Sequence, residues 1–316
     1  MAAGCDPAAL AGLSGRDYLS SADLSGAQTA ALLNLAADLK AGRQTANLTG
    51  RTLGLIFTKA STRTRVSFTV AMARAGGQTI DLDPTVTQLG RGEPLADTAR
   101  VLSRYVDALA VRTFAQSELV DYAHWATIPV LNALTDREHP CQALADYLTL
   151  REAFGEIPGL TLAYVGDGNN VAHSLMLCGA LLGVNVRIGT PVGFAPATAV
   201  LEQARTLAAG RCTIEVGHDP LATVRGAHAL YTDVWASMGQ EAEQGRREEA
   251  FRGWCLDETL LSEADSRAIV LHCLPAHRGE EISPGVIEGS ASRVFDQAEN
   301  RLHVQQALLA TVLGAL

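Results

Sequence analysis

Residues 52–70 read TLGLIFTKASTRTRVSFTV, an apolar run followed by a polar turn and a helical pattern. The run at 52–57 is typical of a buried strand, and Val66, Val70 and Ala73 then fall on one face of a helix. A strand that leads through a short turn into a helix is the first half of a βαβ unit. The stretch therefore predicts a parallel α/β fold, with chemistry at the carboxyl end of the strand.

The polar turn is Ser61-Thr62-Arg63-Thr64-Arg65. A helix N-terminus offers unpaired N–H groups and a partial positive charge, and a guanidinium matches the oxygens of a phosphate. Two arginines stand where the helix dipole favours acidic side chains, which suggests that a bound anion supplies the negative charge. A capped helix with solvated arginines is the alternative that the local pattern leaves open.

Apolar runs recur along the whole chain and alternate with helical patterns. The expected strands are 52–57, 79–82, 108–112 and 128–132 in the first half, and 161–165, 184–188, 212–216, 228–232 and 268–272 in the second. This alternation predicts the α/β class, with two doubly wound parallel-sheet domains. A helix over residues 139–154 is expected to link the two halves.

The composition sets limits on the class of protein. A chain of 316 residues suggests two domains, and 47% hydrophobic residues are ordinary for large buried sheets. The net charge of -9 argues against nucleic acid as a partner. Six scattered cysteines without a CxxC pair indicate free thiols, and neither a signal peptide nor a membrane span is evident. We expect a cytoplasmic protein that does not bind membranes.

Other polar segments also follow expected strands. Arg112 ends the strand over 108–112 and could be a second cationic donor to the same anion, or a surface charge. His139 and Gln142 stand one turn apart at a helix start that Pro140 favours, so both could face one ligand. A capped helix start without a ligand is the alternative here.

Three further segments lie in the second half. Gly166-Asp167-Gly168-Asn169-Asn170 suggests a dinucleotide loop only weakly, because Val171 stands where a third glycine is wanted. Asp233 follows a strand and could hold an ammonium group, or be a solvated loop residue. In His272-Cys273-Leu274-Pro275 the cysteine could be a nucleophile, a metal ligand, a proton acceptor or a small buried hydrophobe.

These segments, in this order, resemble the aspartate/ornithine carbamoyltransferase family. The similarity runs from about residue 50 to residue 305, and Gln88-Leu89-Gly90-Arg91-Gly92-Glu93 adds to it. Five motifs carry it, namely Ser61-Thr62-Arg63-Thr64-Arg65, His139-Pro140-Cys141-Gln142, Gly166-Asp167-Gly168-Asn169-Asn170, Asp233-Val234-Trp235-Ala236-Ser237-Met238-Gly239 and His272-Cys273-Leu274-Pro275.

The resemblance implies the carbamoyltransferase fold and its reaction. Residues 1–150 would bind carbamoyl phosphate, with the C-terminal helix at about 295–316 packed back on them, and residues 151–294 would bind ornithine. The implied reaction transfers the carbamoyl group of carbamoyl phosphate to the δ-amino group of L-ornithine, giving L-citrulline and phosphate. No metal and no organic cofactor is implied, because phosphate is already a good leaving group. The implied assembly is a homotrimer or a multiple of one.

The resemblance also implies which residues form the site. The implied catalytic residues are Cys273, Arg63, Arg112 and His139. Carbamoyl phosphate would be bound by Ser61, Thr62, Arg63, Thr64, Gln88, Arg112, His139, Gln142, Cys273, Leu274 and Arg301, with Gln88 reaching the site of a neighbouring subunit. Ornithine would be bound by Asn170, Asp233, Ser237 and Met238, with Cys273 beside its δ-amino group.

The chain departs from the family pattern at two positions, and its residues leave other functions open. Many members carry Glu where Thr58 and Thr69 stand. Aspartate, putrescine and acylated ornithines are alternative acceptors within the family, although the Asp233 segment favours a free α-amino acid. A nucleotide-binding oxidoreductase and a non-catalytic binding protein are the alternatives outside it.

Overall fold

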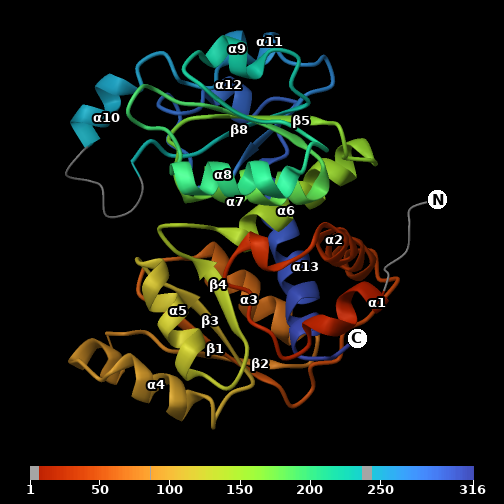
Figure 1. Cartoon of the computed structure of the whole chain (residues 1–316), viewed down its shortest axis with the longest axis vertical. Coiled ribbons are helices and arrows are strands. Elements are labelled where there is room, and N and C mark those ends of the chain that lie inside the picture. Colours follow the sequence, from red (N-terminus) through yellow and green to blue (C-terminus); the bar gives the residue numbers. More distant parts are fainter. Residues whose placement is uncertain (1–6, 86, 237–243) are drawn as a thin grey trace. The chain divides into compact units, whose positions relative to one another are not determined.

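The computed structural model describes residues 7–85, 87–236 and 244–316. The chain divides into two compact units, unit 1 with residues 1–148 and 300–316, and unit 2 with residues 149–299. Each unit contains one parallel sheet with helices packed on both faces (Figure 1), which confirms the predicted α/β class.

The sheet of unit 1 has four strands in the described residues, in the order β2-β1-β3-β4. All three strand pairs are parallel. The strands are β1 (Thr52–Phe57), β2 (Gln78–Asp81), β3 (Ala108–Arg112) and β4 (Val130–Leu134). Strands β1 and β3 are buried almost throughout, as expected for the centre of a parallel sheet.

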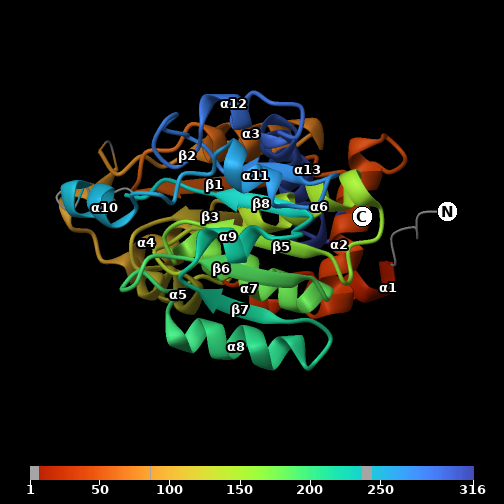
Figure 2. The same cartoon turned by 90° about the horizontal axis from the view of Figure 1, so that it is seen from above.

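Helices cover both faces of this sheet. Helices α4 (Leu95–Leu102) and α5 (Gln116–Trp125) lie on one face, and α3 (Arg63–Arg74) lies on the other (Figures 1 and 2). The remaining helical elements are α1 (Pro7–Leu10), η1 (Ala11–Leu13), η2 (Ser21–Asp23), α2 (Gly26–Lys40), η3 (Gln88–Arg91), α6 (Pro140–Phe154), which continues into unit 2, and α13 (Val294–Val312), which begins there.

The apolar residues on the helices of unit 1 are not all buried. Ala99 of α4 is buried in a cluster with Val106, Leu109 and Leu119. Val66, Val70 and Ala73, which fall on one face of α3, do not form its buried face. Val66 is 54% exposed, whereas Phe68 and Met72 are fully buried. Two apolar faces are present on this helix, and sequence periodicity alone does not say which of them packs on the sheet.

Unit 2 contains five described strands in the order β7-β6-β5-β8-β9, all paired in parallel. The strands are β5 (Thr161–Val165), β6 (Asn185–Gly189), β7 (Ile214–Gly217), β8 (Ala229–Thr232) and β9 (Ile269–His272). The helices are α7 (Asn170–Leu182), α8 (Thr198–Ala208), α9 (Pro220–Val224), α10 (Gln244–Ala250), α11 (Glu258–Ser262) and α12 (Pro284–Ile287). Every strand in both units lies within two residues of its predicted bounds.

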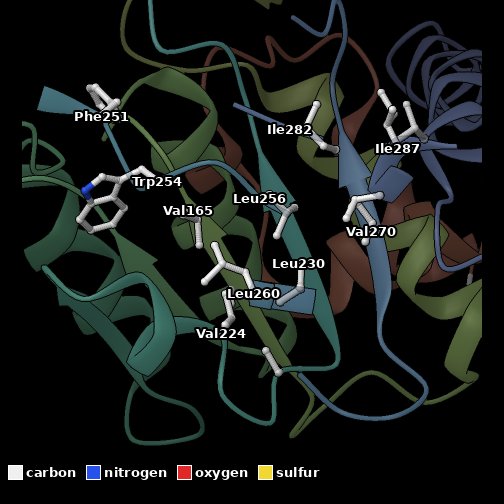
Figure 3. Close-up of a cluster of buried hydrophobic side chains, with 14 residues drawn as sticks. Val165, Val224, Leu230, Phe251, Trp254, Leu256, Leu260, Val270, Ile282 and Ile287 are labelled. Carbon is white, nitrogen blue, oxygen red and sulfur yellow. The ribbon is translucent and has the colours of Figure 1, made fainter. Parts of the chain in front are cut away.

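One face of the second sheet is covered by α7 and α8, and the other by α9, α11 and α12 (Figures 1 and 2). The second face carries a buried cluster that joins strands to helices, drawn in Figure 3. Val165, Leu230 and Val270 from the strands pack there with Val224 from α9 and Leu260 from α11. This packing fixes where β5, β8 and β9 end, and therefore where the polar segments after them begin.

The order of strands creates a switch point in each sheet. In unit 1 the chain passes from β1 to β2 on one side and then to β3 on the other side of β1. In unit 2 it passes from β5 through β6 to β7, and then to β8 on the other side of β5. Ligands of open parallel sheets bind at the carboxyl ends of the strands that flank such a point. The two places to search for a site are therefore the ends of β1 and β3, and the ends of β5 and β8.

Among the described residues, no helix combines the length and the apolar character that crossing a bilayer requires.

Candidate active site

The first switch point brings two predicted segments together. Phe57, the last residue of β1, is paired in register with Arg112, the last residue of β3. The turn Ser61-Thr62-Arg63-Thr64-Arg65 starts just after β1, so its arginines and Arg112 lie at the same edge of the sheet. Residues distant in sequence thus meet because parallel neighbours end together.

Helix α3 begins at Arg63 without a side-chain cap. Thr62 occupies the N-cap position in a helical conformation and makes no capping hydrogen bond, and no acidic residue stands in the first turn. The first N–H groups of a helix need partners outside it, and the dipole makes this end positive. The start of α3 therefore retains the donors and the positive potential that an anion requires.

Three guanidinium groups lie around His139. Burial lowers the pKa of His139 well below its ordinary value, and the charges of Arg301, Arg112 and Arg63 lower it further. His139, Arg112 and Arg301 are all buried in unit 1. The ring is therefore neutral at pH 7, and the positive charge of this region comes from the arginines.

Arg301 reaches the cluster from the C-terminal helix. Its guanidinium donates a hydrogen bond to the Thr64 hydroxyl, with Nη2 2.6 Å from Oγ1. Both residues are buried, and 237 positions separate them in the sequence. Residues 300–316 thus supply unit 1 with a cation that the first 148 residues alone would lack.

Arg65 has a different environment from Arg63. It forms an ion pair with Asp81 at the end of β2, and its guanidinium lies over the Phe57 ring at 5.1 Å. These contacts neutralise one of the two first-turn arginines. Arg63 is the first-turn arginine whose charge acts on His139.

The segment that carries His139 is held in place by Glu138. Its carboxylate accepts hydrogen bonds from the Ser20 hydroxyl at 2.5 Å and from the Ser21 N–H at 2.9 Å. Glu138 is completely buried, and burial raises the pKa of its carboxyl group. Helix α6 then begins at Pro140, as predicted, and places Gln142 one turn beyond His139. Gln88 lies apart from this cluster in η3, where its side chain is exposed.

The second switch point holds Asp233, just after β8. Its two carboxylate oxygens accept hydrogen bonds from different elements, one from the Cys273 thiol at 2.9 Å and one from the Asn169 amide at 2.9 Å. Asp233 is buried and Cys273 is half-buried. The thiol proton therefore points at a carboxylate, which is the arrangement needed to pass a proton on.

Asn169 and Asn170 occupy different positions at the start of α7. Asn169 is the N-cap, and its Oδ1 accepts from the N–H groups of Val171 and Ala172. Asn170 is the first residue of the helix and is half-buried. The cap thus orients Asn169 toward Asp233.

In the loop after β5, Gly168 packs closely against another segment of the chain. A Cβ on Gly168 would lie 2.3 Å from the Pro196 nitrogen and 2.5 Å from the Ala195 carbonyl carbon. The Gly168 N–H donates to the Phe194 carbonyl oxygen at 2.9 Å. Gly168 is therefore required for close packing against the chain itself, and not for the approach of a pyrophosphate.

A buried ion pair lies beside this loop. Arg247 of α10 contacts Asp167 at 2.7 Å and also donates to the Trp235 carbonyl oxygen at 2.8 Å. Burial raises the pKa of Asp167, and the Arg247 charge opposes that rise. The predicted residues Ser237 and Met238 lie outside the described residues. Trp235 precedes Ser237 and Met238 in the sequence, and Arg247 follows them. The hydrogen bond between Arg247 and Trp235 therefore joins the two ends of this segment.

The loop after β9 is fixed by His272 and Glu281. Nδ1 of His272 accepts from the Leu274 N–H at 2.8 Å, so Nε2 carries the proton that is donated to Glu281 at 3.0 Å. Leu274 has φ +60°, and the peptide bond between Leu274 and Pro275 is cis. These contacts set the position of Cys273 relative to β9.

Two groups of possible metal ligands occur in the described residues. Asp233, His272 and Cys273 present ligand atoms within 4.8 Å of one another, as do His277, Glu280 and Glu281. Both ring nitrogens of His272 already take part in hydrogen bonds. The first group would have to give up one of these bonds to hold an ion with all three residues.

Comparison with known proteins gives the family. The carbamoyl-P binding domain of aspartate/ornithine carbamoyltransferase matches residues 16–152, and the Asp/Orn binding domain of the same family matches residues 158–312. The chain belongs to the aspartate/ornithine carbamoyltransferase family. The two family domains meet just beyond Leu148, where the two compact units divide.

Individual carbamoyltransferases match over nearly the whole chain. The ornithine carbamoyltransferase of Parasynechococcus marenigrum is 75% identical, over 98% of this chain and 97% of its own length. That of Prochlorococcus marinus is 73% identical, over 98% and 97% respectively. The crystal structure of the enzyme from Gloeobacter violaceus is 55% identical, with a TM-score of 0.88, and covers 95% of this chain and 99% of its own. The Pyrococcus furiosus structure is 49% identical, with a TM-score of 0.92 and coverage of 96% and 99%.

Sequence reasoning on this carbamoyltransferase missed several supporting residues. Glu138, Asn169, Arg247 and Glu281 each hold a predicted site residue, or a neighbour of one, through contacts described above. Asn169 stands inside one of the quoted motifs and Glu138 directly precedes another, so their place in the sequence was the only available signal. Arg247 contacts a partner 80 positions away, and no local pattern indicates such a pair.

Proposed function

We propose that the chain transfers the carbamoyl group of carbamoyl phosphate to the δ-amino nitrogen of L-ornithine, giving L-citrulline and phosphate. The carbamoyl carbon gains a bond to nitrogen and loses its bond to the bridging oxygen, which leaves with the electron pair. The observation that carries the proposal is the group of Arg63, Arg112 and Arg301 around neutral His139, in a member of this family.

Unit 1 binds carbamoyl phosphate in this proposal. The phosphate lies at the uncapped start of α3, where Ser61, Thr62 and Thr64 add hydroxyl donors and Arg63 adds charge. Arg301 and Arg112 complete the positive surroundings, since both act on the same buried histidine. A dianion is stabilised best by such pre-positioned donors, which cost no reorganisation during the reaction.

The carbonyl oxygen becomes more negative as nitrogen attacks. His139 is neutral, so it donates an N–H to this oxygen without adding a fourth positive charge. Arg112 and the Thr64 hydroxyl donate to the same oxygen, and Arg63 with the start of α3 stabilises the departing phosphate. Positioning and charge stabilisation of this kind supply most of the rate in a reaction that needs no covalent intermediate.

Unit 2 binds ornithine. Asn170 takes the α-carboxylate, while Asp233, Ser237 and the Met238 backbone hold the α-amino group. Cys273 and Leu274 lie at the other end of the ligand, beside the δ-amino nitrogen and the carbamoyl group. The support is that Asn169 and Cys273 both bond to Asp233, which brings three predicted segments to one place.

The δ-amino group must lose a proton before it attacks. An alkyl ammonium resembles lysine, whose pKa is about 10.4, and is almost wholly protonated at pH 7. The Cys273 thiol, bonded to Asp233 at 2.9 Å, offers a route by which that proton can leave. Desolvation of the ammonium on binding would act in the same direction.

The proposed assembly is a homotrimer, or a multiple of one, in the cytoplasm. Gln88 is exposed in η3, as a residue serving a neighbouring subunit's site should be. Val66 and Ile80 expose apolar surface on the same unit, 54% and 46% respectively. The cysteines of the described residues are free thiols, which fits a reducing compartment.

The test is an initial-rate assay of citrulline formation against both substrates, with aspartate, putrescine and N-acetylornithine as competing acceptors. Ornithine should be used at least about a hundredfold better than the others, because it alone offers a free α-amino acid and a second amine. The variant Arg63→Gly should lose several orders of magnitude in kcat/KM while its melting temperature stays close to wild type. Absence of citrulline, or near-normal turnover in Arg63→Gly, would contradict the proposal.

A further inference from the structure

The amide group of Gln142 is fixed at one end by a second residue of α6. Its Nε2 donates to Oδ1 of Asp146 at 2.8 Å, four positions further along the helix. Both side chains are buried, with 1% and 0% exposure. The Asp146 oxygen accepts in this bond, so the NH2 end of the Gln142 amide faces Asp146. The chemistry of the pair thereby decides which way the amide points.

The other end of the same amide has an unused acceptor. Oε1 of Gln142 is buried and has no hydrogen-bond partner among the described residues. Buried amide oxygens are almost always hydrogen-bonded, so this oxygen calls for a donor that the described part of the chain does not provide. Gln142 lies one turn beyond His139, and the charges of Arg63, Arg112 and Arg301 act on that histidine.

The polarity of these surroundings identifies the missing donor. Guanidinium groups donate only, and they match the phosphate and the carbonyl oxygen of an acyl phosphate. Of the groups on carbamoyl phosphate, only the NH2 donates hydrogen bonds. It needs an acceptor in a region otherwise rich in donors, and Oε1 of Gln142 is such an acceptor.

We propose that Asp146 is a positioning residue that fixes the Gln142 amide with its oxygen toward the carbamoyl NH2, and that this pair selects carbamoyl phosphate over acyl phosphates. The inference rests on the proposed function, because it assigns a role within the same binding site. Acetyl phosphate, which carries a methyl group in place of the NH2, cannot donate to Oε1. If the amide were turned over, its NH2 would oppose the carbamoyl NH2, and two donors would face each other without an acceptor.

The experiment compares three ligands on the intact enzyme. It measures the KM of carbamoyl phosphate, and the inhibition constants of acetyl phosphate and inorganic phosphate against it, at saturating ornithine. The variant Asp146→Leu removes the acceptor and keeps the branched shape of the side chain. Asp146→Asn keeps one oxygen that can accept from Gln142, and Gln142→Met removes the amide altogether. Asp146→Ala replaces Asp146→Leu if the latter does not fold, and it carries the same expectation.

The ratio of the acetyl phosphate constant to the carbamoyl phosphate KM is the decisive quantity. Asp146→Leu should lower this ratio about tenfold, as expected for one buried hydrogen bond. The inhibition constant of inorganic phosphate should change by less than about threefold. Asp146→Asn should keep most of the ratio. Adding Asp146→Leu to Gln142→Met should change nothing further, because Asp146 acts through the amide.

Three outcomes would overturn the inference. A ratio that is unchanged in Asp146→Leu would show that the amide needs no partner to select its ligand. An equal weakening of all three ligands, or a further fall in the Gln142→Met background, would show a general structural role instead. Citrulline formation by the wild-type enzyme keeps these outcomes separate from a failure of the proposed function.

Discussion

His139 is buried beside the guanidinium groups of Arg63, Arg112 and Arg301, and burial together with these charges keeps its ring neutral. A neutral imidazole can still donate one N–H to a carbonyl oxygen, while the arginines carry the charge that a phosphate needs. His139 therefore supplies a hydrogen-bond donor, and the three arginines supply the positive charge.

The titration of His139 can be measured directly by NMR on ring-labelled protein. Its pKa should lie below the ordinary value of about 6.5, and Arg301→Met should raise it, since Arg301 is the charge that lowers it most. A wild-type value at or above 6.5, or no rise in Arg301→Met, would contradict the arrangement described here.

The same shift makes folding stability depend on pH. A histidine with a lowered pKa in the folded state stays neutral while the unfolded chain takes up a proton. The free energy of unfolding should therefore fall as pH drops below about 6.5, by at most about 1.4 kcal/mol per pH unit from this residue. Denaturant melts at pH 7 and pH 5.5 should show a smaller fall for His139→Gln than for wild type.

Cys273 gives the third prediction at this scale. Its thiol is bonded to Asp233 in unit 2, whereas the arginines that we assign to the phosphate lie in unit 1. Cys273→Ser should therefore raise the KM of ornithine, or lower kcat, by about tenfold or more, and change the KM of carbamoyl phosphate by less than about twofold. Unchanged ornithine kinetics would remove Cys273 from the mechanism.

Individual elements place these residues, and α10 shows how. Arg247 on this helix bonds to Asp167 after β5 and to the Trp235 carbonyl oxygen after β8. It thus ties together the two strand ends of the second switch point. The pair is buried, so removing one partner leaves an uncompensated charge on the other.

Arg247→Gln should raise the KM of ornithine by about tenfold or more while leaving that of carbamoyl phosphate nearly unchanged. The matched control is Arg246→Gln, because Arg246 is exposed on the same helix. Steady-state kinetics with each substrate varied in turn would measure the KM of ornithine and of carbamoyl phosphate in both variants. An equal effect of the two substitutions would show that helix α10 matters only through its charge.

The elements were largely predictable from sequence, and the contacts between them were not. Buried parallel strands form continuous apolar runs, so all of them were predicted within two residues of their bounds. The apolar pattern of α3 did not show which face packs on the sheet, since Val66 is exposed while Phe68 is buried. The contacts of Glu138 with Ser20 and Ser21 join residues more than a hundred positions apart, and only the fold brings them together.

The whole molecule adds a requirement that a single chain does not display. Gln88 is exposed in η3, and we propose that it serves the site of a neighbouring subunit. Arg63→Ala and Gln88→Ala should then each be nearly inactive alone. Mixed trimers of the two should recover part of the activity, because some sites would combine a normal Arg63 with a normal Gln88.

The recovery should reach a measurable fraction of wild-type activity after the two variants are denatured and refolded together, and none when each is refolded alone. Arg74→Ala mixed with Arg63→Ala is the control, since Arg74 lies exposed at the far end of α3. Additive activity without recovery in the first mixture would place Gln88 in its own subunit's site, or in none.

The central claim is that the arginines around His139 hold the phosphate of carbamoyl phosphate. The most direct test is a crystal structure with a phosphonate analogue that joins the carbamoyl phosphate and ornithine skeletons. The phosphonate oxygens should lie within hydrogen-bond distance of Arg63, Arg112 and the first N–H groups of α3, with the carbonyl oxygen at His139. A phosphonate bound elsewhere on the chain, or these arginines left without it at saturating analogue, would contradict the claim.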